Sequence, residues 1–313
     1  MRNSASLLVL CFGLSYYLIE RIGLFSSGPV PVLDVLYSKP FLSASLLFLI
    51  VTFVTTFRNR GNVKMSGWIY VTAVILLIAG LWLSYLTRFS GEAVVTEGQT
   101  FYSGHRDYAP ETLYRGRFAS VPDIALKLDE LVPALNKNND HIKRLKGTFS
   151  LITTKSNDQR EVVITSGLPS FLDGAFFRIR DMGYSPRYVL KSDKGRILDS
   201  SFVFMKLFPP GSEDNIRLLS PLTYYIRYYP AGTENLDEPH LVLRIVRNKD
   251  IVFNDRVRLS EDAVFEKNRI SFDEIRKWTR LSITRDWGVV PALCGIILGL
   301  ISLMMRGVKS GSI

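Results

Sequence analysis

Apolar residues gather in four blocks of the 313-residue chain, three before about residue 87 and one after about residue 288. A helix that crosses a bilayer needs about 20 mostly apolar residues. The blocks therefore predict four transmembrane helices, at about 7–25, 41–57, 67–86 and 289–305. Only the first block carries charges: Glu20 and Arg21, near its far end, are expected at the membrane surface or facing the helix bundle.

The first block has a second interpretation, because an N-terminal apolar run can be a cleaved signal peptide. No clear small-x-small cleavage site follows this run, and Glu20-Arg21 comes directly at its end. We therefore interpret residues 7–25 as a retained helix. The chain then divides into three helices within residues 1–87, an exported region at 88–286, and a fourth helix with its tail at 287–313.

Basic residues beside the apolar blocks predict the orientation of the chain. The segment 58–64 carries three positive charges and no negative charge, and the C-terminal tail carries Arg306 and Lys309 without an acid. Short cytoplasmic segments are enriched in lysine and arginine. This places both termini in the cytoplasm and the large region between the third and fourth helices outside it.

The exported region is predicted to be all-β, an antiparallel sandwich or an open barrel. Its short apolar runs are separated by turn signals such as Asp173-Gly174, Lys194-Gly195 and Pro209-Pro210-Gly211. A last strand at about 276–285 should lead directly into the fourth helix. The other predicted strands are at 94–101, 147–153, 161–164, 175–179, 187–190, 201–205, 224–229 and 241–246.

One stretch of the exported region departs from the strand pattern. Residues 122–131 place apolar residues at helical spacing, and Ser120 or Asp123 is a suitable N-cap. This pattern predicts a short helix.

Charge and cysteine usage narrow the function classes. The formal net charge is +10, but part of the excess lies in short loops beside the apolar blocks, and no nucleic-acid-binding motif occurs, so no nucleic-acid partner is expected. Arginines on the predicted strands, Arg178, Arg180, Arg187 and Arg196, form either a solvated face or a basic face towards anionic groups. Both cysteines lie in apolar blocks, so the exported region folds without disulfides.

Residues for catalysis are scarce. The chain has no Walker A loop, HExxH, GxSxG or CxxC motif, and its three histidines are His105, His141 and His240. We therefore expect no enzyme activity. His105 is the candidate of most interest, because an imidazole can ligate haem iron and the adjacent Arg106 can pair with a propionate. A structural loop histidine is the simpler interpretation.

Tryptophans stand at the ends of the apolar blocks. Trp82 lies near the end of the third block and Trp287 directly precedes the fourth. Indole prefers the membrane–water interface, so both are expected to be anchors. A haem-stacking role for Trp82 and Trp287 is the alternative.

Several segments, in order along the chain, resemble the ResB-type cytochrome c biogenesis proteins. The segment 34–41, before the second block, is similar to that family's run of aspartate, tyrosine, serine and an aromatic residue. The segment 80–98 passes through Phe89-Ser90-Gly91 to Thr96-Glu97-Gly98. The segment 285–289 is similar to the family's basic-Asp-Pro-Gly entry, with Trp287 in place of proline. Turns at 167–169 and 173–174 lie between them.

The resemblance implies a role in System II cytochrome c maturation, in a bacterial inner membrane with the large domain on the periplasmic side. Its implied partners are a CcsA-type membrane protein and c-type cytochromes, and its implied cofactor is haem. The family typically has a haem-associated histidine in its third helix, whereas residues 67–86 contain none. Haem binding is therefore left open. A second hypothesis is a non-catalytic accessory subunit of a membrane respiratory or electron-transfer complex, built on the same scaffold.

Overall fold

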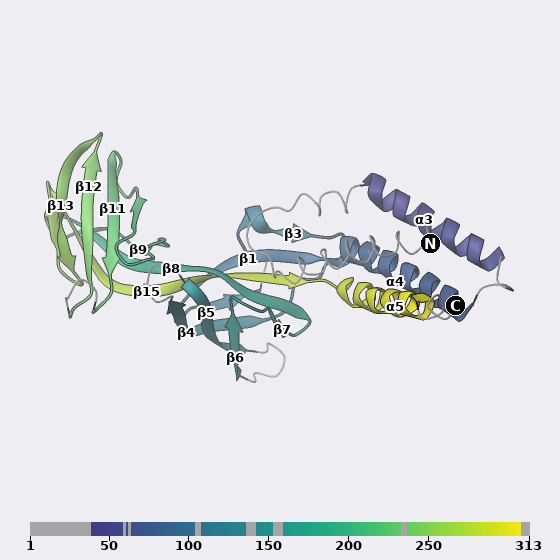
Figure 1. The fold of residues 1–313 in the computed structure, drawn as a ribbon. Coiled ribbons are helices and arrows are strands. Elements are labelled where there is room, and N and C mark those ends of the chain that lie inside the picture. Colours follow the sequence, from purple (N-terminus) through teal and green to yellow (C-terminus); the bar gives the residue numbers. More distant parts are fainter. Residues whose placement is uncertain are drawn as a thin grey trace.

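The computed structural model shows an elongated molecule with helices at one end and a β-sheet at the far end (Figure 1). Between them lies a second body of strands. The structure describes residues 39–58, 61, 64–103, 108–135, 142–152, 159–232 and 237–307. The predicted first helix at 7–25 lies outside the described residues.

The described residues contain three α-helices at the end of the molecule opposite the far sheet. They are α3 (Lys39–Arg58), α4 (Met65–Thr87) and α5 (Val289–Gly307). The stretch Phe41–Arg58 and all of α4 are long and apolar enough to cross a membrane. These two helices confirm the second and third predicted blocks. Helix α3 exposes most of its apolar side chains, whereas α4 is partly buried against its neighbours.

The predicted count of four spanning helices is not what the structure supports. Its apolar helix at the C-terminal end, Val289–Met305, is shorter than α3 and α4. A run of about 17 residues rises about 26 Å, slightly less than the roughly 30 Å hydrocarbon core of a bilayer. The described residues therefore contain two helices that are long and apolar enough to cross a membrane, and a shorter apolar one.

Three antiparallel sheets form the rest of the described chain. Sheet A has the order β3-β1-β15-β8-β7, with β14 paired to β15 and β9 paired to β8. Its strands are β1 (Phe89–Thr96), β3 (Tyr114–Arg115), β7 (Ser170–Leu172), β8 (Ala175–Ser192), β9 (Ile197–Phe202), β14 (Ala263–Phe265) and β15 (Asn268–Arg285). A short 3₁₀ helix, Pro110–Thr112, precedes β3.

The other two sheets have four strands each. Sheet B has the order β2-β4-β5-β6, and its strands are β2 (Thr100–Tyr102), β4 (Ala125–Leu135), β5 (Ile142–Ile152) and β6 (Gln159–Thr165). Sheet C has the order β10-β11-β12-β13, and its strands are β10 (Glu213–Ile216), β11 (Leu222–Tyr229), β12 (His240–Arg247) and β13 (Asp250–Arg258).

Two separate hydrophobic cores lie along sheet A. The proximal core, nearer the helices, joins side chains of sheet A such as Phe177 and Leu281 to side chains of sheet B such as Phe149. The distal core joins Phe272 of β15 to Tyr224 of β11 and to the rest of sheet C. The region between α4 and α5 therefore has two pairs of stacked layers, one at each core, which agrees with the predicted antiparallel β-rich class.

Strands β8 and β15 connect the two cores. They pair along nearly their whole length, from Asn268 opposite Ser192 to Thr284 opposite Phe176. Two of the predicted strands, 175–179 and 187–190, are thus parts of the single strand β8, and the predicted last strand, 276–285, is the end of β15. Where the cores meet, Trp278 stands opposite Gly183.

The predicted helix at 122–131 is wrong, because this stretch forms the start of strand β4. Leu126, Leu128 and Leu131 point into the proximal core. Their spacing of two and then three residues comes from a β-bulge after Leu128, where the register with β5 shifts. A bulge inserts one residue into the period of two, and the resulting spacing imitates that of a helix.

Candidate functional site at the helix–sheet junction

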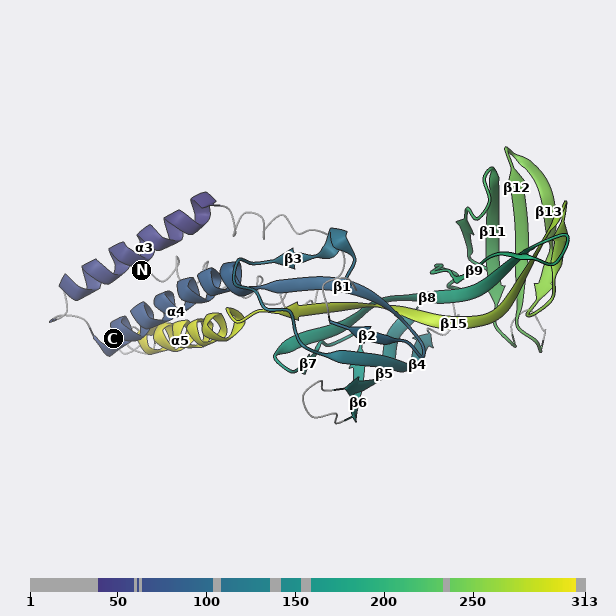
Figure 2. The ribbon, with the colours of Figure 1, turned by 180° about the vertical axis from the view of Figure 1, so that it is seen from behind.

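Helices α4 and α5 run directly into the two neighbouring strands of sheet A, as seen from behind in Figure 2. Helix α4 ends at Thr87 and β1 begins at Phe89, while β15 ends at Arg285 and α5 begins at Val289. Phe89 and Arg285 are register partners in the sheet. The pairing of the two strands therefore brings the two helices together at one point, which we call the junction.

Small residues let the two helices approach at backbone distance. A Cβ atom at Gly80 would lie 2.7 Å from the amide nitrogen of Ala292, and one at Gly295 would lie 2.9 Å from the carbonyl oxygen of Ala73. At the other end of the pair, the Ser302 hydroxyl donates to the Ser66 carbonyl at 2.9 Å. Close packing over small residues is typical of helices that associate in membranes.

A buried carboxylate fixes the start of α5. Asp286 is 7% exposed and accepts hydrogen bonds from the Ser84 hydroxyl of α4 and from the backbone N–H of Gly288, the latter at 2.9 Å. A side-chain acceptor of this kind satisfies a backbone donor at a helix start and suits the positive end of the helix dipole. The contact also ties α4 to α5.

The two predicted tryptophans lie in different surroundings. Trp82 packs beside α3 and α5 and meets Tyr85 edge to face, with 6.4 Å between ring centroids. Its indole N–H is buried and has no hydrogen-bond partner among the described residues. Trp287 is 49% exposed, and the Arg285 guanidinium lies over its ring at 5.1 Å. The structure does not join these two side chains into one aromatic pair.

His105 and Arg106 lie outside the described residues. The residues on either side are described: Ser103 is buried and donates a hydrogen bond to the Pro122 carbonyl, and Tyr108 packs in the proximal core. The Tyr108 ring meets Phe89 at 5.1 Å. Ser103 and Tyr108, the described residues on either side, are therefore both buried.

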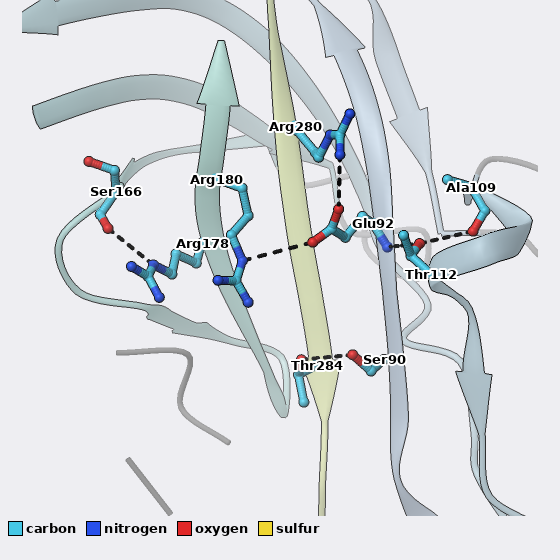
Figure 3. A network of polar contacts seen from close by, with 9 residues as sticks. All are labelled: Ser90, Glu92, Ala109, Thr112, Ser166, Arg178, Arg180, Arg280 and Thr284. Atoms are coloured by element: carbon cyan, nitrogen blue, oxygen red, sulfur yellow. Dashed lines mark hydrogen bonds and ion pairs between the residues drawn. The ribbon is translucent and has the colours of Figure 1, made fainter. Parts of the chain in front are cut away.

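An arginine network that sequence reasoning missed lies on the outer face of sheet A (Figure 3). Glu92 of β1 faces Arg280 of β15 at 3.6 Å and Arg180 of β8 at 3.9 Å. Arg178 donates to the Ser166 carbonyl at 3.1 Å, and burial, followed by the charge of Arg180, lowers the pKa of Arg178. The alternation along each strand predicts which side chains point outward. It does not predict which side chains of distant strands will pair.

The predicted basic face on the strands is only partly assembled. Arg178 and Arg180 lie together beside the junction, whereas Arg187 is exposed on the distal half of β8 and Arg196 is exposed in the turn before β9. The distal half of β8 faces sheet C rather than the junction. The four arginines therefore do not form one patch.

The described residues do not form a haem-ligating set. Helices α3, α4 and α5 contain no histidine, and no group of three or more potential metal ligands occurs within the described ranges. His240, the single histidine that the structure describes, is buried in β12 and stacks on Tyr229 at 5.0 Å, in the distal body. No mechanistic step through haem follows from these positions.

Comparison with known proteins does not assign the chain: no family pattern matches it, and no curated protein matches its sequence. The geometry at the junction is that of a rigid connection between helices and sheet. Ser84 and Asp286 hold the helices together, and Glu92 bridges three strands.

Proposed function

We propose that this chain is a ResB-like membrane protein that assists the maturation of c-type cytochromes. It would act beside a CcsA-type partner, by handling apocytochrome or by supporting haem delivery, and without catalysis of its own. The support is the resemblance of segments 34–41, 80–98 and 285–289 to that family. The structural observation that carries the proposal is the direct continuation of α4 into β1 and of β15 into α5.

This continuity has a mechanical consequence in the proposal. A β body joined to two packed helices through two paired strands cannot swing freely, because neither connection contains a flexible linker. The body then holds a fixed orientation above the bilayer. A docked apocytochrome would be presented at a constant distance from the membrane partner.

To the two helices of spanning length, the proposed topology adds residues 7–25 as a first membrane helix and the shorter α5 as the last. Both termini lie in the cytoplasm of a bacterium, and the β body lies on the outer side of the inner membrane. The basic segment 58–64 supports this orientation. Attachment of a phosphatase reporter after residue 232 tests it, since activity outside the cytoplasm is expected.

A gene deletion tests the maturation role. Loss of the chain should lower the amount of haem-stained c-type cytochromes while leaving b-type cytochromes unchanged, and the full-length chain should restore them. A CcsA-type protein should copurify with the full-length chain. Unchanged c-type cytochromes after deletion would refute the proposal, whatever copurifies.

An accessory subunit of a respiratory or electron-transfer complex is the second candidate. The observation in its favour is that α3, α4 and α5 offer no histidine as an axial haem ligand. In that case the chain should be found in fixed stoichiometry within a purified oxidoreductase. Deletion should then lower that enzyme's assembly and leave the soluble c-type cytochromes intact.

A further inference from the structure

Three arginine–aromatic pairs surround the junction, and together we call them the collar. The Arg88 guanidinium lies 5.3 Å from the Tyr114 ring centroid, and that of Arg117 lies 5.6 Å from the Phe118 ring centroid. The third pair is Arg285 over Trp287. Each pair combines a permanent cation with an apolar ring, a combination suited to a surface that is part apolar and part charged.

Strand register places the collar at one level of the molecule. Phe89 is paired on one side with Arg285 and on the other with Arg115. The loop after β3 closes onto the end of α4, because Phe118 donates its N–H to the Leu86 carbonyl at 2.8 Å and Gly116 donates to that of Arg88 at 2.8 Å. The pairs therefore lie at the level where α4 ends and α5 begins.

The collar arginines are short of anionic partners. Arg88, Arg117 and Arg285 form no ion pair with a carboxylate of the described residues. The Nε atoms of Arg88 and Arg285 are buried without a hydrogen-bond partner. Two acids close to the collar arginines in the sequence are engaged elsewhere: Asp286 accepts from Ser84 and Gly288, and the Glu92 side chain faces Arg180 and Arg280.

Two of the three aromatic members of the collar are exposed where polar side chains would be expected. Phe118 is 66% exposed and Trp287 is 49% exposed, both beside the ends of apolar helices. Indole and phenyl rings at such a level prefer the region between lipid tails and headgroups. Unpaired guanidinium groups at the same level have a matching anion in the lipid phosphate, which accepts two parallel N–H bonds.

We propose that the collar binds the phosphate headgroups of anionic phospholipids in the outer leaflet of the membrane. The rings of Phe118 and Trp287 insert at the boundary of the tails, and Arg88, Arg117 and Arg285 donate to headgroup oxygens. The inference rests on the placement of α4 and α5 in a bilayer, which is part of the proposed function. It does not depend on a role in cytochrome maturation.

Native mass spectrometry of the full-length chain in detergent micelles, titrated with phosphatidylglycerol or phosphatidylcholine, tests the proposal. A basic residue near a charged membrane contributes about 1 kcal/mol, which is about a fivefold change in affinity. The triple variant R88Q/R117Q/R285Q should bind phosphatidylglycerol roughly a hundredfold more weakly. The single variant Arg117→Gln, in an exposed loop, should lose about fivefold without affecting the fold.

A matched triple variant distinguishes the effect of losing the collar arginines from the effect of lowering the net charge. Arg187, Arg217 and Arg269 are exposed on the distal body, so R187Q/R217Q/R269Q removes the same charge and should change the affinity by less than about twofold. Equal binding of the two lipids by the native chain would overturn the proposal, as would unchanged binding by both collar variants. Displacement of the lipid by millimolar inorganic phosphate would instead assign the site to free phosphate.

The cytochrome assay tests the maturation role, whereas the lipid titration tests the collar. Normal cytochrome levels in a strain with the collar variants, together with lost lipid selectivity, would support the collar and leave the maturation role standing. Lost maturation on deletion with equal binding of both lipids would overturn only the collar.

Discussion

Replacement of Gly80 by alanine tests whether α4 and α5 pack at backbone distance. The added Cβ would lie 2.7 Å from the Ala292 nitrogen and 2.8 Å from the Gly288 carbonyl oxygen, where ordinary contact begins at 3.4 Å. Backbone atoms cannot rotate aside, so the helices must separate locally by about 0.7 Å, the difference between 3.4 and 2.7 Å. Overpacking of this kind costs about 1–3 kcal/mol.

Alanine also restores helix propensity relative to glycine, worth about 1 kcal/mol. The free energy of unfolding of Gly80→Ala should therefore fall by up to about 2 kcal/mol, as measured by titration of the full-length chain in micelles with a denaturing detergent. Gly167→Ala is the control, because no atom lies within 4 Å of its added Cβ. Its free energy of unfolding should change by less than about 0.5 kcal/mol.

A second substitution sharpens the test. Ala292→Gly removes the side-chain atom that lies 2.9 Å from the new Cβ but leaves the two backbone atoms in place. The double variant G80A/A292G should therefore recover only part of the loss. A Gly80→Ala chain that is more stable than the native one would refute the close packing of α4 and α5, because alanine would then act through propensity alone.

Three further predictions concern the junction, the place where the two cores meet, and the distal core. Asp286→Ala should lower the free energy of unfolding by about 1–2 kcal/mol, because it removes the acceptor of the Gly288 N–H, and Asp286→Asn should recover part of the loss in the same titration. Trp278→Phe should cost about 1–3 kcal/mol, since the buried indole N–H donates to the carbonyls of Tyr184 at 3.2 Å and Met205 at 3.0 Å. Burial, with smaller contributions from Tyr228 and Glu97, raises the pKa of Tyr184 to about 12. The contribution of Tyr184 to the free energy of unfolding should therefore be fully present below pH 10 and be lost as the pH rises from about 10 to 12. Tyrosinate absorbance measures this ionisation.

Each of these predictions has a contrary result. An Asp286→Ala chain as stable as the native one would mean that solvent replaces the carboxylate at the start of α5. A neutral Trp278→Phe would show that both carbonyls find other donors. A difference in tyrosinate absorbance between the native chain and Tyr184→Phe that develops around pH 10, without loss of the fold, would contradict the burial of the Tyr184 hydroxyl.

The apolar helices could be predicted because a long uninterrupted run of apolar residues determines its own secondary structure. Residues 41–57 and 67–86 match α3 and α4 closely, since nothing outside these segments decides their form. Strand β4 was not predictable in the same way. Its bulge after Leu128 exists because β5 pairs with it, and the sequence of β4 alone cannot distinguish a bulged strand from a helical repeat.

The division into two cores was also hidden. Alternation along β8 indicates which residues are buried but not which sheet buries them, and Phe177 and Tyr188 belong to different cores. The network on sheet A could not be predicted for the same reason. Glu92 meets Arg180 and Arg280 only because strands that are distant in the chain become neighbours. No local pattern marks such a pair, whereas the position of Trp287 beside an apolar block is enough to predict an interfacial residue.

The central place of β15 in sheet A has a consequence for biosynthesis. Strand β1 is made early, but its partner from Trp278 to Arg285 is the last part of the β body to leave the ribosome. The proximal core therefore stays open through the synthesis of sheets B and C, since long-range strand pairing must wait for both strands. The same residues that close the sheet directly precede α5. The β body is thus completed just as α5 is synthesised. A chain truncated before residue 278 would leave β1 as an exposed edge open to aggregation.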